Sequence, residues 1–368
     1  MPNPFVYSKP VAPEALIDRN QERTQLLELL QGGHNCRLSA PRRYGKTSLV
    51  HNVRAVADRE GTPTVYVNFY GILSLEEAVA RLERGYRQLR GPLARWVTGK
   101  LEGLSVSLST PAGSLGVSGM ARRAPERLLH ELLDLPAQLF ARSGARVLVC
   151  FDEFQEVLST RFALDGAIRS AIEAHHDEAA YLFSGSHPGM MRALFEDRER
   201  PFYGQARAIS LAPLAAEDVA DYVGSQFEST RRDVTAALRP LLAVSQGHPQ
   251  RAMMLAHFLW EMTPRDGVAD ESTFGEALEV VLEELAEAFD RTWRGLDDGQ
   301  RRTLLAVVIS DGRPTRAAAL EAADVPRSTV AEALARLRDA GFVFDHDGRV
   351  RLVDPLLALW VTRGRADA

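Results

Sequence analysis

Residues 40–48 read Ala-Pro-Arg-Arg-Tyr-Gly-Lys-Thr-Ser and follow a short apolar segment. Apart from Ala40, which stands where a glycine is usual, they match the pattern G-x-x-x-x-G-K-[ST] of loops that hold nucleotide phosphates. In such a loop, backbone N–H groups surround the phosphates, the lysine reaches the β- and γ-phosphates, and the Ser/Thr hydroxyl binds Mg²⁺. Lys46 and Thr47 therefore predict binding of a nucleoside triphosphate together with Mg²⁺.

Lysine is rare elsewhere in this chain. The 44 basic residues include only three lysines, at positions 9, 46 and 100, and the others are arginine. A compact ammonium fits among phosphate oxygens and a planar guanidinium does not, so the two are not interchangeable at this position. The presence of Lys46 in an arginine-rich chain favours a phosphate loop over the alternative, a chance match in an exposed turn.

Two adjacent carboxylates end a second apolar segment. Residues 146–151 read Arg-Val-Leu-Val-Cys-Phe and precede Asp152 and Glu153, which is typical of a buried strand that ends at a site. Asp152 would hold Mg²⁺ through its coordination shell, and Glu153 would polarise the attacking water. We predict Lys46, Asp152 and Glu153 as catalytic residues, and Thr47 and Asp152 as metal ligands. The alternative is a strand that simply ends in solvent.

The composition limits the class of protein. The chain has 368 residues, of which 45% are apolar and 25% charged, enough for two or three domains. A formal net charge of -5 gives no overall basic field, so nucleic-acid binding would need a local patch. The sequence shows no signal peptide and no apolar run of transmembrane length. We expect a soluble, cytoplasmic protein with two reduced, buried cysteines and no membrane contact.

Residues 1–212 alternate short apolar strands with helical patterns, as a doubly wound parallel sheet requires. In such an α/β fold the ligand lies at the carboxyl ends of the strands. Alternating serine and apolar residues around a Pro/Gly turn predict an inserted β-hairpin at about 104–118. The predicted strands are 36–39, 64–69, 146–151, 181–184 and 208–211, and the predicted helices are 20–30, 46–59, 75–90, 126–142 and 164–175.

Two further domains are predicted after the sheet. Residues 213–295 contain helical patterns only, at 216–227, 233–245, 250–262 and 272–293, and form an α-helical domain. Residues 296–368 predict helices at 298–310, 315–322 and 327–340, followed by a hairpin at 341–352. Three helices and a two-stranded wing are the pattern of a winged helix-turn-helix. Pro326 fits the start of the third helix, where a missing N–H costs nothing.

The winged helix leaves two kinds of partner open. Arg327 and Arg336 on the presumed recognition helix, and Arg349 and Arg351 on the wing, favour duplex DNA. Residues 296–368, however, contain eleven arginines and eleven acidic residues, and phosphate contacts normally supply most of the affinity for DNA. A neutral module is equally compatible with a protein partner or with self-association.

Together these motifs resemble the archaeal-type ATPase family, in the signal-transducing (STAND) branch of the AAA+-like P-loop ATPases. The resemblance runs nearly end to end and implies a sheet in the order 5-1-4-3-2, an α-helical lid and a C-terminal winged helix. The residues that carry it are Asn3-Pro4-Phe5, Ile17-Asp18-Arg19, the loop at 40–49, residues 151–155, Pro201-Phe202-Tyr203-Gly204, Gly247-His248-Pro249 and Asp354-Pro355-Leu356.

The resemblance also implies roles for further residues, with ATP as the nucleotide. Ile17, Asp18 and Arg19 would border the adenine, and His248 and Pro249 would close over the nucleotide. Ser186, with Ser184 beside it, would be the polar sensor near the γ-phosphate. The predicted nucleotide-binding residues are Ile17, Arg19, Pro41, Arg42, Arg43, Tyr44, Gly45, Lys46, Thr47, Ser48, His248 and Pro249.

Two positions depart from the family pattern. Gln205 stands where similar members have an arginine that would stabilise the transition state, and the available substitutes are Arg207, Arg200 and Arg251. We include Arg207 among the predicted catalytic residues. Ala40 requires that its φ stay negative. We expect a Mg²⁺-dependent ATPase that couples its nucleotide state to the winged helix. The alternative is a nucleotide-gated regulator or DNA-binding switch with little intrinsic ATPase activity.

Overall fold

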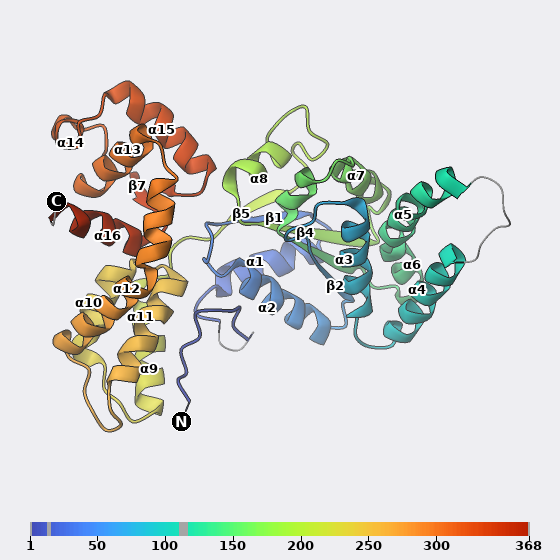
Figure 1. Ribbon diagram of the computed structural model, residues 1–368. Helices are drawn as coiled ribbons and strands as arrows, with labels where there is room; N and C mark the ends of the chain where they lie inside the picture. Colours follow the sequence, from blue (N-terminus) through green and yellow to red (C-terminus); the bar gives the residue numbers. More distant parts are fainter. Residues whose placement is uncertain (1, 13–15, 110–116, 367–368) are drawn as a thin grey trace.

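The computed structural model describes residues 2–12, 16–109 and 117–366. It has two lobes, an α/β lobe that ends at β5 (Arg207–Ser210) and a helical lobe that begins at α9 (Ala216–Ser229). The N-terminal segment runs between the two lobes (Figure 1). None of the described helices combines the length and the apolar character needed to cross a membrane.

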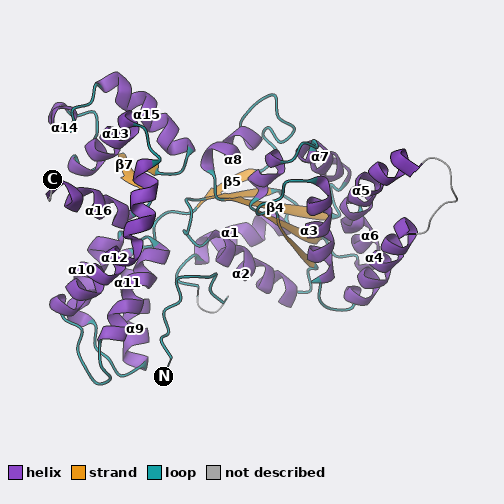
Figure 2. Ribbon diagram, in the orientation of Figure 1, coloured by secondary structure: helices purple, strands orange, loops and turns teal. Residues whose placement is uncertain are grey.

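A five-stranded parallel sheet forms the centre of the α/β lobe (Figure 2). Its strand order is β2-β3-β4-β1-β5, which is the predicted order 5-1-4-3-2 read from the other edge, so the prediction is confirmed. The remaining strands are β1 (Cys36–Ser39), β2 (Thr64–Asn68), β3 (Val147–Asp152) and β4 (Ala179–Gly185).

Helices cover both faces of this sheet, because successive side chains of a strand point to opposite faces. In β3, Val149 and Phe151 pack into one core, whereas Leu148 and Cys150 pack into the other. The Leu148 face is covered by α1 (Asn20–Gln31) and α2 (Lys46–Arg59). The Val149 face is covered by α3 (Leu75–Arg87), α4 (Leu93–Ser109), α5 (Val117–Leu133), α6 (Leu135–Ser143), α7 (Leu164–Ala174), α8 (Pro188–Phe195) and the 3₁₀ helix η2 (Phe154–Ser159).

The predicted hairpin at 104–118 is wrong where the structure describes it. Residues 104–109 continue α4 and residues 117–118 begin α5, while residues 110–116 lie outside the described residues. Val97, Leu101 and Leu104 have helical spacing and pack against the core of the sheet. The alternation of serine and apolar residues at 104–118 predicted strands. The helical spacing of the residues that contact the core favours a helix instead.

The helix predicted at 126–142 is two helices. α5 ends at Leu133 and α6 begins at Leu135, with Pro136 in its first turn. Proline has no N–H to continue the hydrogen bonds of the preceding helix, so the chain starts a new helix there. The sequence did not predict α4, α8 or the last helix, α16 (Pro355–Ala366).

The helical lobe contains the predicted winged helix, in which an antiparallel hairpin follows α15. Its helices and strands share one continuous hydrophobic core, which also includes Phe5 of the N-terminal segment. Among the described residues, this one core extends across the predicted boundary at 295. The division into domains at 212 and 295 therefore stays a prediction. The other elements are α10 (Thr235–Ser245), α11 (Pro249–Met262), α12 (Glu271–Arg294), α13 (Asp298–Ile309), α14 (Ala317–Ala322), α15 (Arg327–Asp339), β6 (Val343–His346) and β7 (Arg349–Leu352).

Candidate functional site

The loop between β1 and α2 has the backbone shape of a phosphate-binding loop. Gly45 has a φ of 84° and Arg43 a φ of 68°, so the chain turns sharply before α2 begins at Lys46. Ala40 is not among the residues with positive φ, so its side chain adds no strain where a glycine is usual. The free N–H groups at the start of α2 face this loop, as anion binding at a helix N-terminus requires.

Lys46 lies inside the loop and is nearly buried, with 6% of its surface exposed. Its Nζ donates to the carbonyl oxygens of Ala40 at 2.8 Å and Pro41 at 2.7 Å. Burial lowers the pKa of Lys46 to about 8, while the charges of Glu153 and Asp152 raise it. The ammonium is therefore charged at neutral pH, and among the described residues it donates to two neutral carbonyl oxygens and forms no direct ion pair.

Thr47 and Asp152 meet at the carboxyl end of the sheet. The Thr47 hydroxyl donates to Oδ2 of Asp152 at 2.9 Å, and Asp152 is 1% exposed. Hydroxyl and carboxylate oxygens are the hard ligands that Mg²⁺ takes, usually with substrate phosphates and water completing the set. Among the described residues no group of three or more His, Cys, Asp or Glu could hold a metal. The donor set fits a magnesium ion that arrives with a nucleotide.

Glu153 adopts a left-handed backbone conformation, with a φ of 51° directly after β3. Its Oε2 accepts hydrogen bonds from the Ser186 hydroxyl and from the Gln155 amide, both at 2.6 Å. Ser186 is thus brought to the site as predicted. The Ser184 hydroxyl is fully buried on β4 and has no hydrogen-bond partner in the described structure.

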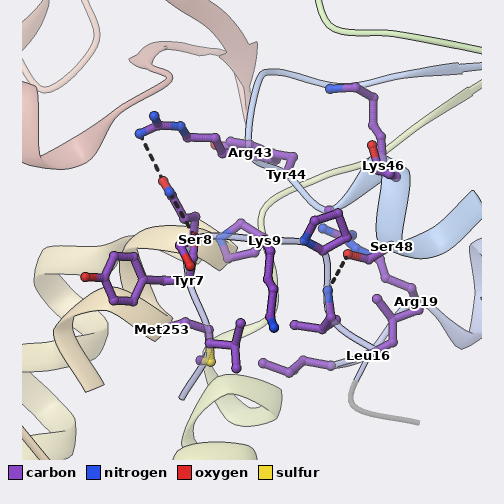
Figure 3. Close-up of a pocket in the computed structure, with 18 of the residues that line it drawn as sticks. Tyr7, Ser8, Lys9, Leu16, Arg19, Arg43, Tyr44, Lys46, Ser48 and Met253 are labelled. Atoms are coloured by element: carbon purple, nitrogen blue, oxygen red, sulfur yellow. Dashed lines mark hydrogen bonds between the residues drawn. The ribbon is translucent and has the colours of Figure 1, made fainter. Parts of the chain in front are cut away.

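A cavity of about 700 Å³ opens beside these residues. Lys46, Glu153 and Ser186 border it, and so does Thr47, whose hydroxyl donates to Asp152. Figure 3 shows this cavity with Lys46 among the labelled residues. Most predicted nucleotide-binding residues are in its wall. They are Ile17, Arg19, Arg42, Arg43, Tyr44, Gly45, Lys46, Thr47, Ser48 and Pro249.

Residues 3–12, which we call the N-terminal strap, form a wall of the cavity that the sequence did not predict. The backbone N–H of Val11 donates to the Ser48 hydroxyl at 3.2 Å, and Gln250 Nε2 of α11 donates to the Tyr7 carbonyl at 3.1 Å. Figure 3 shows the Lys9 side chain of the strap on the side of Leu16 and Met253, away from Lys46. The strap thus connects α2 to the helical lobe across the cavity.

Arg19 reaches the cavity but already has partners. Its Nη1 donates to Glu22 at 2.9 Å and its Nη2 to the carbonyl of Ala212 at 2.6 Å. The residue is 4% exposed and has a φ of 80°. Arg19 therefore ties the start of α1 to the chain that leaves β5, and it also borders the cavity.

His248 does not line the cavity in this structure, so its contact with the nucleotide stays a prediction. Its Nδ1 accepts from the backbone N–H of Arg251 at 3.3 Å and so caps α11. The imidazole is 2% exposed and its ring centre lies 4.9 Å from that of Tyr44. Capping turns the ring toward the back of the phosphate loop, and burial lowers its pKa to about 4. The next residue, Pro249, lines the cavity.

The predicted catalytic Arg207 lies at the wrong end of the sheet for the site of its own chain. It begins β5 and pairs with Cys36, the first residue of β1, whereas the phosphate loop follows the last residue of β1. The two substitutes are also engaged. Arg251 is 2% exposed and forms an ion pair with Asp354, and Arg200 lies 3.7 Å from Asp165.

The basic residues predicted for DNA contact are mostly paired within the winged helix. Arg349 and Arg351 both pair with Asp311, and Arg336 pairs with Asp297 at 3.1 Å. Arg327 is exposed and forms no ion pair within the described part of the chain. The winged helix therefore presents less free positive charge than its sequence indicates.

The end of α15 packs against α8 of the α/β lobe. Arg192 of α8 forms an ion pair with Asp339 of α15. A Cβ atom on Gly189 would lie 2.9 Å from the Asp339 backbone oxygen, so only glycine allows this approach. The predicted recognition helix is thus attached to the α/β lobe at its C-terminal end.

Two solved structures share this fold over nearly the whole chain. The Walker-type ATPase of Pyrococcus abyssi is similar with a TM-score of 0.67 and 18% identity, over 96% of this chain and 99% of that chain. The ORC2 protein of Aeropyrum pernix, in ADPNP–ADP complexes, has a TM-score of 0.58 and 16% identity, over 98% of both chains. No known family profile and no curated protein sequence matches this chain. The likeness shows that the chain has the P-loop ATPase fold.

Proposed function

We propose that this protein binds and hydrolyses Mg²⁺-ATP and couples its nucleotide state to its winged helix. The observation that carries the proposal is the 2.9 Å hydrogen bond between Thr47 and Asp152 at a cavity bordered by Lys46 and Glu153. The P-loop ATPase fold supports it, as do the nucleotides named for the similar ORC2 structure. Membership of the archaeal-type ATPase family and a cytoplasmic location are parts of the same proposal.

Lys46 and the loop bind the phosphates. The Lys46 ammonium exchanges its contacts with the Ala40 and Pro41 carbonyls for phosphate oxygens, which attract it more strongly because they are charged. Thr47 and Asp152 hold the magnesium ion. When bound, Mg²⁺ neutralises charge on the β- and γ-phosphates.

Glu153 orients the attacking water. Ser186 and Gln155 both hold its Oε2, which fixes the carboxylate and leaves Oε1 to accept from a water molecule. A base held in this way needs no rearrangement before the reaction, and positioned general bases contribute about 10²–10⁴-fold to rates. Ile17, Arg19 and Pro249 line the part of the cavity proposed for adenosine.

Intrinsic turnover is proposed to be slow. Arg207 is distant, Arg251 is neutralised by Asp354, and Arg200 is exposed beside Asp165. None of these three arginines, as described, reaches the phosphate site. An arginine finger is worth about 10³–10⁵-fold in rate, so a partner or a second copy that supplies one would accelerate hydrolysis.

Tyr44 provides the proposed coupling between nucleotide and winged helix. This loop residue is 2% exposed. Its ring centre lies 4.9 Å from that of His248, in the helical region 213–295 that we call the lid, and 6.0 Å from that of Phe344 in the wing. An ion pair between the buried Arg251 and the partly buried Asp354 also links α11 to the chain that leaves β7. A change in the loop on phosphate binding therefore acts on the lid and the wing through close-packed side chains.

A nucleotide-gated regulator with little hydrolysis is the second candidate, favoured by this coupling and by the missing arginine. A protein partner fits the winged helix better than duplex DNA, because Asp311 neutralises Arg349 and Arg351. Both candidates require that ATP and ADP bind two arrangements of the lid and wing with different affinity. Partner binding that is identical with ATP, with ADP and without nucleotide would contradict both forms of coupling.

The test compares wild type with Lys46→Ala in ATP binding and in phosphate release from Mg²⁺-ATP. We expect Lys46→Ala to abolish release and to weaken ATP binding at least about tenfold, because a charged donor to phosphate is lost. Lys100→Ala is the matched control, since Lys100 lies on α4 and does not border the cavity. Equal ATP binding by wild type and Lys46→Ala would refute the proposed function.

A further inference from the structure

Asp152 has more hydrogen-bond partners than its motif predicts. Its Oδ2 accepts from the Thr47 hydroxyl at 2.9 Å and from the Tyr66 hydroxyl at 2.8 Å, and its Oδ1 accepts from the Glu153 backbone N–H at 3.1 Å. An ionised carboxylate has about four acceptor sites. These three donors fix the orientation of the carboxylate and leave acceptor capacity on Oδ1.

Tyr66 reaches Asp152 from the neighbouring strand. In the register of β2 and β3, Tyr66 lies opposite Cys150 and Asn68 lies opposite Asp152. Tyr66 is therefore the diagonal neighbour of Asp152, at a separation that an aromatic side chain can span. No nucleotide-binding motif includes this position, so the sequence motifs gave no signal for it.

The Tyr66 side chain is held on several sides. The Arg54 guanidinium lies 5.0 Å from the centre of its ring and the His51 ring lies 4.8 Å away, and both residues belong to α2. Asn68 Nδ2 donates to the Tyr66 oxygen at 3.3 Å, so the hydroxyl hydrogen is directed at Asp152. Burial and the charge of Asp152 raise the pKa of Tyr66, and the hydroxyl stays a donor at neutral pH.

We propose that Tyr66 is a positioning residue for the magnesium site, holding the Asp152 carboxylate beside Thr47 before the metal binds. The inference rests on the proposed function. Groups that hydrogen-bond to a metal ligand set its orientation, and their loss typically costs about 10–100-fold in metal affinity. Without the Tyr66 hydroxyl, Oδ2 keeps only the Thr47 contact, and the carboxylate must be ordered when Mg²⁺ binds.

The test is Tyr66→Phe, which removes the hydroxyl and keeps the ring in contact with Arg54 and His51. ATP binding is measured at equilibrium over a range of Mg²⁺ concentrations and in excess chelator. We expect the half-saturating Mg²⁺ concentration to rise about tenfold, with ATP affinity in chelator unchanged. Asn68→Ala, which removes the donor to the Tyr66 oxygen, is expected to give a smaller shift of about twofold to threefold in the same direction.

Tyr181→Phe is the matched control. Tyr181 lies on β4, and its hydroxyl is paired with His175 Nδ1 at 2.9 Å rather than with Asp152. We expect it to lower the thermal stability of the nucleotide-free protein without moving the Mg²⁺ midpoint. Equal midpoints for wild type and Tyr66→Phe, or equal shifts for Tyr66→Phe and Tyr181→Phe, would overturn the inference alone. A wild type that binds no ATP at any Mg²⁺ concentration would overturn the proposed function and this inference with it.

Discussion

The phosphate loop and the wing both place basic side chains near carboxylates, with opposite results. At the loop, the Lys46 ammonium is held by two backbone carbonyls, and Asp152 is held by hydroxyl and amide donors. At the wing, Arg349 and Arg351 share the carboxylate of Asp311. A charge held by neutral groups keeps its capacity for an ionic ligand, whereas a charge that is already paired must first give up its partner. The loop is therefore arranged for an ionic ligand, and the wing is not.

The largest expected effect tests the loop side of this comparison. Glu153→Gln keeps the size of the side chain and its contacts with Ser186 and Gln155 but removes the charge that orients water. We expect phosphate release to fall about 10²–10⁴-fold while the ATP dissociation constant stays within about threefold. Single-turnover hydrolysis and equilibrium ATP binding measure the two quantities. Unchanged turnover would exclude Glu153 as the base.

The Arg251–Asp354 pair resembles the pairing seen at the wing, but its arginine is buried and its carboxylate only partly exposed. Asp354→Asn leaves the Arg251 guanidinium buried without a countercharge, and we expect it to lower the free energy of unfolding by about 3–5 kcal/mol. Denaturant unfolding at pH 7 measures this loss. A change below about 1 kcal/mol would show that the pair behaves like an exposed one.

Acid provides a second test of this pair. Burial raises the pKa of Asp354, but its hydrogen bonds and ion pair with Arg251 lower it more, so the net pKa lies below the ordinary value of 3.8. The stabilisation by Asp354 is therefore complete above the ordinary pKa and is lost as the pH falls through the lowered one. The stability difference between wild type and Asp354→Asn should shrink below about pH 4.

The pH dependence of ATP affinity tests the charge of Lys46 in the phosphate loop. Burial lowers the pKa of Lys46 to about 8 in the free protein, and bound phosphate favours the charged form. Binding above this pH therefore requires uptake of a proton, and we expect affinity to fall up to about tenfold per pH unit above pH 8. Lys46→Ala, which has no ammonium to titrate, should lose this dependence in its weaker residual binding. ATP-binding titrations between pH 7 and pH 10 measure this pH dependence for both proteins.

The smallest expected effect concerns the paired arginines of the wing. Asp311→Asn releases Arg349 and Arg351, and we expect affinity for duplex DNA to rise about twofold to fivefold with a steeper salt dependence. Stability should change by less than about 1 kcal/mol, because the Asp311 side chain is 63% exposed. Titrations of a fluorescent duplex at two salt concentrations measure both. An unchanged salt dependence would show that these arginines do not face DNA.

The sequence predicted the sheet and the centre of the site because local signals define both. The apolar runs of β1 and β3 end at Ser39 and Asp152, and parallel strands bring such ends to one edge. Lys46 and Thr47 lie at the end of the loop that follows β1, and Asp152 and Glu153 lie at the end of β3. The winged helix was predicted for the same reason, since its helices and hairpin each have a local period.

The errors arose where long-range contacts decide. Arg207 was predicted as a substitute for the missing arginine, but its register with Cys36 puts it at the start of β5, away from the phosphate loop. His248 was predicted beside the nucleotide, but its ring caps α11 and does not line the cavity. Neither pairing register nor the partners of a charged side chain can be read from spacing alone. The strap and Tyr66 were missed for the same reason.

The strap gives the nucleotide site a kinetic property. A nucleotide in the cavity lies behind a segment attached to α2 through Val11 and to the helical lobe through Tyr7. Phe5 sits in the core of the helical lobe and is 2% exposed, so this end of the strap does not open freely. Under the proposed function, ADP would leave only when the Val11 contact or the contact with the helical lobe opens, so slow product release is expected.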